Sequence, residues 1–167
     1  MILEPNTKML LFRYSNYKKY SFIDEHISIL QDKGHVWMLK LGRRINPEKV
    51  HEIAENGGWM VLRMPKADGG SSYLAKFIDM QEKPPKDDCY PEYYKEFLEN
   101  KDEEFLYYGD SQKQWFKITF CQPISSSEAS SLVVSKNMKS VDDVVKTTRT
   151  AVMFIQNDSQ IEINGVD

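Results

Sequence analysis

The apolar residues of this chain fall into short runs that turn-forming residues interrupt. The longest runs have the length of a strand, such as residues 9–12 (MLLF) and residues 151–155 (AVMFI). None approaches the roughly 20 apolar residues that a membrane-spanning helix needs. The pattern therefore predicts a globular fold built on short strands, with no membrane among its partners.

Strand and helix signals alternate irregularly along the chain. Strands are predicted at residues 8–15, 35–42, 59–64, 73–80, 114–120 and 150–155, and helices at residues 21–34, 46–58, 91–100 and 140–148. Several strands follow one another as hairpin candidates. This order favours an α+β fold, in which an antiparallel sheet curls into a barrel that short helices cover.

Two of these helices begin at a serine that can cap them. Ser21 can cap the first helix, with Asp24 three residues later, and Gly34 suits the position just past its end. Ser140 and Asp143 form the same kind of pair at the last helix. These signals predict where both helices begin.

The strand at residues 35–42 (HVWMLKLG) is unusually apolar. One side carries Val36, Met38 and Lys40, and the other side carries Trp37, Leu39 and Leu41. Successive side chains of a strand point to opposite faces. The side with the tryptophan is therefore expected to face a core or the wall of a pocket.

The chain has a net charge of −3, and its charged residues are unevenly distributed along the sequence. Residues 1–86 carry 14 Lys and Arg against 10 Asp and Glu, whereas residues 87–110 carry 2 against 9. The acidic stretch is also rich in tyrosine. A basic face on the first half is therefore compatible with the low overall pI.

No motif for phosphate-loop nucleotide hydrolysis or for a serine nucleophile occurs. The Gly-rich stretch at residues 67–72 (ADGGSS) lacks the lysine of a phosphate loop and is interpreted as a hairpin loop. These absences favour a binding function over an enzymatic one, with no cofactor predicted.

The three histidines show no metal-ligand spacing with the cysteines, so no metal site is predicted. His26 lies on the apolar face of a predicted helix, where a hydrogen-bonded core histidine is expected. His35 and His51 could meet each other and a carboxylate, either Glu52 or Asp79, which leaves a catalytic base open as an alternative.

Cys89 and Cys121 are too few for a disulfide framework, and a reduced pair is expected. Cys89 follows Asp87 and Asp88, whose negative charge disfavours a thiolate. The N-terminal residues lack the features of a signal peptide, so a cytoplasmic location is expected.

Each of the three tryptophans, Trp37, Trp59 and Trp115, follows a chain break and opens a predicted strand. An aromatic side chain at such a position can stack on a nucleobase. The alternative is that all three are core anchors, since tryptophan is largely buried in most proteins. Both interpretations stay open for each residue.

Basic residues accompany aromatic ones in two places. The stretch RYSNYKKY at residues 13–20 alternates cations with tyrosines, and a pair of arginines precedes the helix that starts at Pro47. The alternative for the first stretch is a solvated loop that leans on the core. The predicted phosphate contacts are Arg13, Lys18, Lys19, Lys40, Arg43 and Arg44.

The order of these elements resembles the PUA-like superfamily and, within it, the EVE domains. The resemblance rests on LLFRYSN, HISILQDKGHVWMLKLG, PEKVHEIAENGGWMVLRM, YLAKFIDM, QWFKITF and the closing LVVSKNMKSVDDVVKTTRTAVMFI. It implies one domain over residues 1–156, with an acidic helical insert at about 84–110 and a flexible tail at 157–167.

The resemblance also implies a curved antiparallel β-barrel whose mouth holds one flipped nucleobase, often a modified one. The aromatic cage would come from Trp37 together with Trp59 or Trp115, and from Tyr14 or Ser15 at the end of the first strand. The expected function is therefore non-enzymatic reading of a base in DNA or RNA.

Two other functions stay open. The acidic, tyrosine-rich segment at residues 87–110 could dock a protein partner, or the chain could be a small hydrolase or nuclease. The hydrolase requires His35 or His51 within hydrogen-bond reach of a carboxylate.

Overall fold

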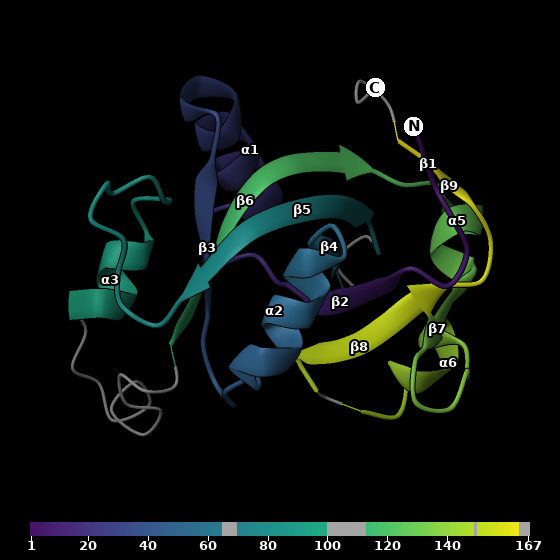
Figure 1. The fold of residues 1–167 in the computed structure, drawn as a ribbon. Coiled ribbons are helices and arrows are strands. Elements are labelled where there is room, and N and C mark those ends of the chain that lie inside the picture. The colour runs from purple at the N-terminus through teal and green to yellow at the C-terminus, as the bar shows by residue number, and fades with distance from the viewer. Residues whose placement is uncertain (65–69, 100–112, 149, 164–167) are drawn as a thin grey trace. The chain divides into compact units, whose positions relative to one another are not determined.

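The computed structural model describes residues 1–64, 70–99, 113–148 and 150–163 (Figure 1). This part of the chain holds nine strands and five helices, which confirms the α+β class and the predominance of strands. Residues 100–110 of the predicted acidic insert lie outside the described residues.

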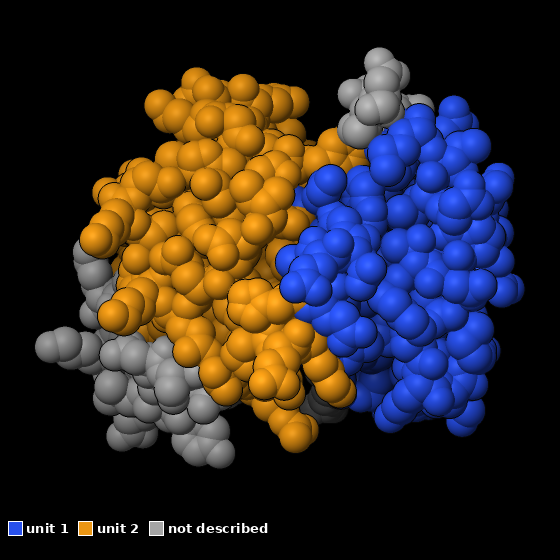
Figure 2. Space-filling model, in the orientation of Figure 1, with its two compact units in different colours: residues 1–15, 52–76, 121–167 blue, residues 16–51, 77–120 orange. Residues whose placement is uncertain are grey.

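The chain forms two compact units that are interleaved in sequence (Figure 2). Unit 1 comprises residues 1–15, 52–76 and 121–167, and unit 2 comprises residues 16–51 and 77–120. The sequence predicted one domain over residues 1–156. Each unit is assembled from segments that are distant along the chain, and the single domain stays a prediction.

Unit 1 is built around β2 (Lys8–Arg13), which pairs parallel with β4 (Trp59–Arg63) and antiparallel with β8 (Val152–Asn157). β7 (Leu132–Val134) continues the sheet beyond β8, and the first half of β5 (Ser72–Gln81) continues it beyond β4. Residues 9–12 of β2 are buried on both faces of the sheet. This explains why they form an unbroken apolar run in the sequence.

A second, two-stranded sheet in unit 1 pairs β1 (Ile2–Leu3) with β9 (Ile161–Glu162). Ile161 is fully buried. The predicted flexible tail from residue 157 is therefore wrong for this stretch. A two-residue strand carries too short a pattern to be recognised without its partner.

The turn before β4 requires glycine. Gly57 has φ +112°, and a Cβ atom there would come within 2.7 Å of the indole nitrogen of Trp59. The indole thus lies against the glycine backbone, and any larger residue would displace it.

The short helices of unit 1 are α5 (Ser126–Ser130) and α6 (Val141–Val144). The predicted cap of α6 is wrong, because the Ser140 side chain makes no capping hydrogen bond. The backbone carbonyl of Ser140 accepts from the Asp143 amide at 3.1 Å instead.

Unit 2 holds α1 (Phe22–Lys33), β3 (Val36–Lys40), α3 (Tyr94–Glu99) and most of β6 (Gln114–Pro123). α2 (Pro47–Glu55) begins in unit 2. The predicted ends of α1 are confirmed: Ser21 Oγ accepts from the Asp24 amide at 3.3 Å, and Gly34 ends the helix with φ 82°.

β3 pairs antiparallel with β6, which aligns Trp37 with Lys117 and Leu39 with Trp115. The side of β3 that carries Trp37 and Leu39 packs into a core, as predicted. The opposite side is buried as well, down to Lys40, so the strand has no solvent-exposed face.

An aromatic cluster fills this core, and half of its members come from the acidic segment. The cluster consists of Trp37, Leu39, Tyr90, Tyr93, Tyr94 and Trp115. Tyr17 and Tyr20 stack on Tyr93 with ring centroids 5.5 and 5.2 Å apart. The described tyrosines of the acidic segment therefore point inward rather than into solvent.

A chain of hydrogen bonds ties α3 to β3 and α1. The Leu39 amide donates to the Tyr94 hydroxyl oxygen at 3.3 Å, and that hydroxyl lies 2.6 Å from His26 Nε2. His26 Nδ1 lies 2.6 Å from the Phe22 carbonyl, which can only accept. Nδ1 therefore carries the proton, and Nε2 accepts from Tyr94. This confirms His26 as a hydrogen-bonded core histidine.

The described strand pairs do not close into a barrel. Among the described residues, β3 pairs with β6 alone and β7 pairs with β8 alone, so no pairing joins β3 to β7. β5 and β6 are long and visibly curved (Figure 1). No helix in the described ranges combines the length and the apolar character needed to cross a membrane.

Burial lowers the pKa of His26 from 6.5 to about 4. The unfolded chain takes up the proton near pH 6.5, while the folded chain resists it, so the free energy of unfolding should fall as pH drops from 6.5 towards 4. The slope should reach about 1.4 kcal/mol per pH unit. Urea unfolding of wild type and His26→Gln at several pH values in this range measures this slope.

His26→Gln should show a flatter dependence on pH over this range. His51→Gln, which removes an exposed histidine, should retain the wild-type slope. Equal slopes in wild type and His26→Gln would contradict the assignment of a neutral buried imidazole.

Candidate functional site

A pocket of about 730 Å³ lies within unit 2. It is lined by Trp37, Arg44, Pro47, His51 and the continuous segment 80–87. These residues come from β3, the loop before α2, the first turn and a half of α2, and the end of β5 with the chain that follows. The pocket thus combines a tryptophan, prolines and several charged side chains.

Trp37 occupies the boundary between the pocket and the aromatic cluster. Its side chain is 5% exposed, and its Nε1 donates to Asp87 Oδ2 at 3.4 Å. The ammonium of Lys117 lies 5.9 Å from the ring centroid. The indole is therefore held on several sides and forms a fixed wall.

The loop that carries Arg43 and Arg44 is anchored by two buried polar side chains. Lys40 Nζ donates to the carbonyls of Leu41, at 3.4 Å, and Arg43. Gln114 accepts from the Ile45 amide at 2.9 Å and donates to the Ile45 carbonyl at 2.8 Å. These bonds fix the loop at the pocket wall.

The charged groups at the pocket are mixed in sign. Arg44 forms an ion pair with Glu82, and both side chains are partly exposed. Lys83 and Lys86 are exposed lining residues of the segment 80–87. The pocket therefore offers cations to an anionic ligand, although Arg44 would first have to exchange its carboxylate partner.

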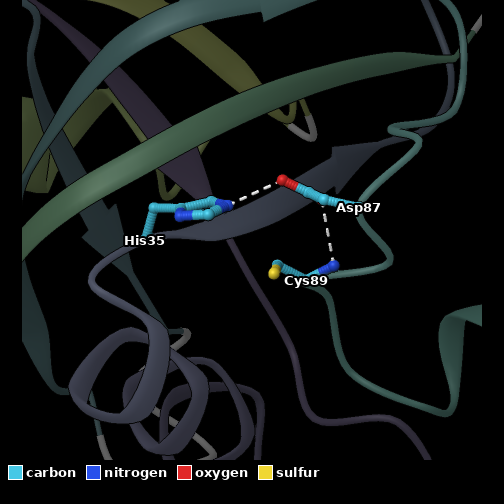
Figure 3. A group of neighbouring side chains, drawn as sticks. All are labelled: His35, Asp87 and Cys89. Atoms are coloured by element: carbon cyan, nitrogen blue, oxygen red, sulfur yellow. Dashed lines mark hydrogen bonds and ion pairs between the residues drawn. The ribbon is translucent and has the colours of Figure 1, made fainter.

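Asp87 connects the pocket to a second group of polar side chains. Its Oδ2 lies 2.8 Å from His35 Nε2, and its Oδ1 accepts from the Cys89 amide at 3.1 Å (Figure 3). The Trp37 amide donates to the Cys89 carbonyl at 2.8 Å. The chain at 87–89 is thus pinned to the beginning of β3.

These contacts set the ionisation of Asp87 and Cys89. Burial opposes ionisation of Asp87, but hydrogen bonds from Cys89, His35 and Trp37 bring its pKa below the ordinary value. Burial and the neighbouring carboxylates of Asp87 and Asp88 raise the pKa of the Cys89 thiol. A carboxylate facing a neutral thiol is poorly suited to cysteine nucleophilic catalysis.

The predicted aromatic cage residues belong to different units. Trp37 and Trp115 share the aromatic cluster of unit 2, whereas Trp59 and Tyr14 are buried in unit 1. Trp115 is fully buried, so it is a core anchor, and Ser15 is exposed. Among the three tryptophans, Trp37 alone lines the pocket described above.

Arg13 is occupied by backbone acceptors. It donates to the Thr148 carbonyl at 2.5 Å and to the Val145 carbonyl at 3.3 Å. Burial and nearby Arg63 lower the pKa of its guanidinium. Its contacts are those of a structural brace for the chain after α6, which differs from the phosphate contact predicted.

The other predicted cations are placed differently from one another. Lys18 pairs with Glu96 of the acidic segment at 3.2 Å, and Lys19 is exposed beside Tyr20. Arg43 and Arg44 are exposed, as a phosphate contact requires.

Lys40 corrects a prediction. It was expected to offer its ammonium to a phosphate, but its residue is 2% exposed and its ammonium is used by the loop carbonyls. The cause is that both faces of β3 are covered, which alternation along a single strand does not reveal. Burial lowers the pKa of Lys40 to about 8.

Sequence reasoning missed Lys83, Lys86 and the partner of His35. The catalytic alternative required a histidine within hydrogen-bond reach of a carboxylate, and Glu52 or Asp79 was expected to supply it. In the structure, the carboxylate beside His35 is that of Asp87. The signal available was the break PPKDD at residues 84–88, which brings charged residues into a turn.

Comparison of the chain with protein-family models, with curated proteins and with solved structures gives no match. The site is therefore interpreted from its own geometry.

Substitution of Gln114 should loosen the loop beside the pocket. Gln114→Ala removes two hydrogen bonds and leaves the buried amide and carbonyl of Ile45 without partners, which should cost about 2–4 kcal/mol in unfolding free energy. Urea unfolding measures the loss. The matched control is Gln160→Ala, an exposed residue, which should change stability by less than about 0.5 kcal/mol.

Lys40 should give the protein a pH dependence on the alkaline side. Because its pKa is about 8 in the fold and 10.5 in the unfolded reference, the unfolded chain binds more protons between these values. Stability therefore rises with pH in this window, by up to about 1.4 kcal/mol per pH unit.

The measurement is the difference in unfolding free energy between wild type and Lys40→Met from pH 8 to 10. Taking the difference cancels the thiols and tyrosines that titrate in the same range. A difference that stays constant with pH would show that the ammonium is not desolvated in the fold.

Proposed function

We propose that this protein binds a nucleobase of DNA or RNA in the pocket beside Trp37. The observation that carries the proposal is the position of a fixed indole at a pocket that is also lined by Arg44, Lys83 and Lys86. An aromatic surface stacks on any base, and nearby cations contact the adjoining phosphates.

The size of the pocket supports this assignment. Its volume of about 730 Å³ lies within the range of roughly 300–1,000 Å³ that small-molecule sites occupy. Trp37, Met80 and the prolines supply an apolar lining, and Asp87 and Gln81 add polar groups to it. A base extruded from a strand, modified or not, has the flat shape that such a pocket accepts.

The relationship to PUA-like and EVE domains belongs to the same proposal. It rests on the order of elements and on the long curved strands β5 and β6, which are compatible with a curved antiparallel barrel. In this proposal the protein acts without catalysis, in the cytoplasm. The cage is reduced to Trp37, because Trp115 is fully buried and Trp59 belongs to unit 1.

One observation favours a second candidate, a hydrolase or nuclease. The distance of 2.8 Å between His35 and Asp87 is the histidine–carboxylate contact that a general base needs. The docking function of the acidic segment gains less support, because Tyr90, Tyr93 and Tyr94 are buried. Within the described part of the segment, a protein partner would meet charged side chains rather than these tyrosines.

Binding of a panel of single- and double-stranded DNA and RNA oligonucleotides, with and without modified bases, tests the proposal. Fluorescence anisotropy at several salt concentrations should give an affinity that falls with salt. Lys83→Ala and Lys86→Ala should each lower the slope of log affinity against log salt by about one, and Trp37→Phe should weaken binding by reducing the stacking area.

Lys136→Ala, an exposed lysine in unit 1, is the matched control and should leave affinity and slope unchanged. Circular dichroism of each variant verifies the fold. Absence of salt-dependent binding to every oligonucleotide would remove the proposal. Cleavage of any oligonucleotide, lost in Asp87→Asn, would establish the hydrolase instead.

A further inference from the structure

Three side chains of the kinds that bind zinc converge where β3 begins. The ligand atoms of His35, Asp87 and Cys89 all lie within 4.8 Å of one another (Figure 3). His35 immediately precedes β3, and the other two residues belong to the chain between β5 and α3. The hydrogen bond from the Trp37 amide to the Cys89 carbonyl holds the two segments together.

We propose that His35, Asp87 and Cys89 form a binding site for a divalent transition metal ion, with Zn²⁺ as the best fit. An imidazole nitrogen, a carboxylate oxygen and a thiolate sulfur are the donors that tetrahedral zinc accepts. Mg²⁺ and Ca²⁺ prefer oxygen ligands throughout, so the histidine and cysteine disfavour them. This site lies beyond the nucleobase-binding function proposed above.

The distances between the three ligand atoms are close to those around a bound tetrahedral ion. Metal–ligand bonds of about 2.0–2.3 Å place tetrahedral ligand atoms about 3.3–3.8 Å apart. His35 Nε2 and Asp87 Oδ2 lie 2.8 Å apart, so they must separate by roughly half an ångström for an ion to replace the proton they share. Their side chains are 21% and 43% exposed, which leaves room for this adjustment and for entry of the ion.

The surroundings orient the carboxylate as an outer shell does in metal sites. Trp37 Nε1 donates to Asp87 Oδ2 at 3.4 Å, and the Cys89 amide donates to Oδ1 at 3.1 Å. Such partners fix ligand direction and influence affinity. Asp88 adds a negative charge beside the site, while Lys33 and Lys117 oppose it.

Three protein ligands leave the fourth position of a tetrahedral ion open to water or a ligand. Asp87 also lines the pocket beside Trp37, so the ion would lie at the pocket wall. A bound ligand could therefore reach the ion.

Titration of the reduced, chelator-treated full chain with Co²⁺ tests the site. The expected result is one equivalent of Co²⁺ bound, with the visible absorption of tetrahedral cobalt and a thiolate-to-cobalt charge-transfer band that Zn²⁺ abolishes. Cys89→Ser should lose the charge-transfer band, and His35→Gln should weaken binding at least about tenfold. Cys121→Ser, which removes a cysteine of unit 1, is the matched control and should bind as wild type does.

Zn²⁺ protection of the thiols provides a second measurement that needs no variant. Zn²⁺ should slow the reaction of Cys89 with a thiol reagent, located by mass spectrometry, and should leave Cys121 unaffected. Zn²⁺ should also raise the melting temperature of wild type, but not that of His35→Gln.

The proposal is overturned if Co²⁺ gives no thiolate band in wild type or if the band persists in Cys89→Ser. It is equally overturned if Zn²⁺ leaves the reactivity of Cys89 unchanged. Oligonucleotide binding is measured in the presence of chelator, so failure of one proposal is recorded independently of the other.

Discussion

The hydrogen-bond chain from Leu39 through Tyr94 and His26 to Phe22 is the interaction on which the rest of unit 2 depends. It joins β3, α3 and α1 through groups that are all buried. Each donor in the chain meets one acceptor, which fixes the imidazole as the neutral Nδ1–H tautomer. A fully satisfied buried network favours a single arrangement, because any displacement leaves a polar group without a partner.

This arrangement has consequences for the candidate site. With Tyr90, Tyr93 and Tyr94 packed on Trp115, the chain that precedes them runs along β3. Asp87 and Cys89 are thereby brought to His35 and Trp37. The acidic segment, which as sequence resembled a docking surface, thus contributes Asp87 to the pocket lining and supplies two of the proposed metal ligands.

The opposite wall depends on burial of two polar residues, Lys40 and Gln114. Both use their side chains to hold the loop of residues 41–45, and both are almost inaccessible to solvent. The loop presents Arg43 and Arg44 outward. The hydrogen bonds of these two buried polar side chains therefore help to position Arg44 at the pocket. The proposed metal site and the proposed base-binding site share Asp87 and so are physically continuous.

The sequence was sufficient where structure follows from local chemistry. It predicted the ends of α1 from Ser21 and Gly34, because capping is decided within one helical turn. It also predicted His26 as a core residue from the helical period.

The expectations failed where neighbours distant in the chain decide the outcome. Lys40 was read as exposed, since nothing local reveals that both faces of β3 are covered. The strand pair of β1 and β9 was missed for the same reason, because its two strands are distant in the chain.

The amino-acid sequence by itself determined the α+β class and the strand-sized core segments, because periodicity and capping act over a few residues. It also determined which aromatic and basic side chains are available. Only the tertiary structure decided which of these side chains meet. His35 and Asp87 are separated by 52 positions, and their 2.8 Å contact exists because buried tyrosines fold the acidic segment onto β3. Spacing along the chain carries no information about such a contact, since packing alone brings the two segments together.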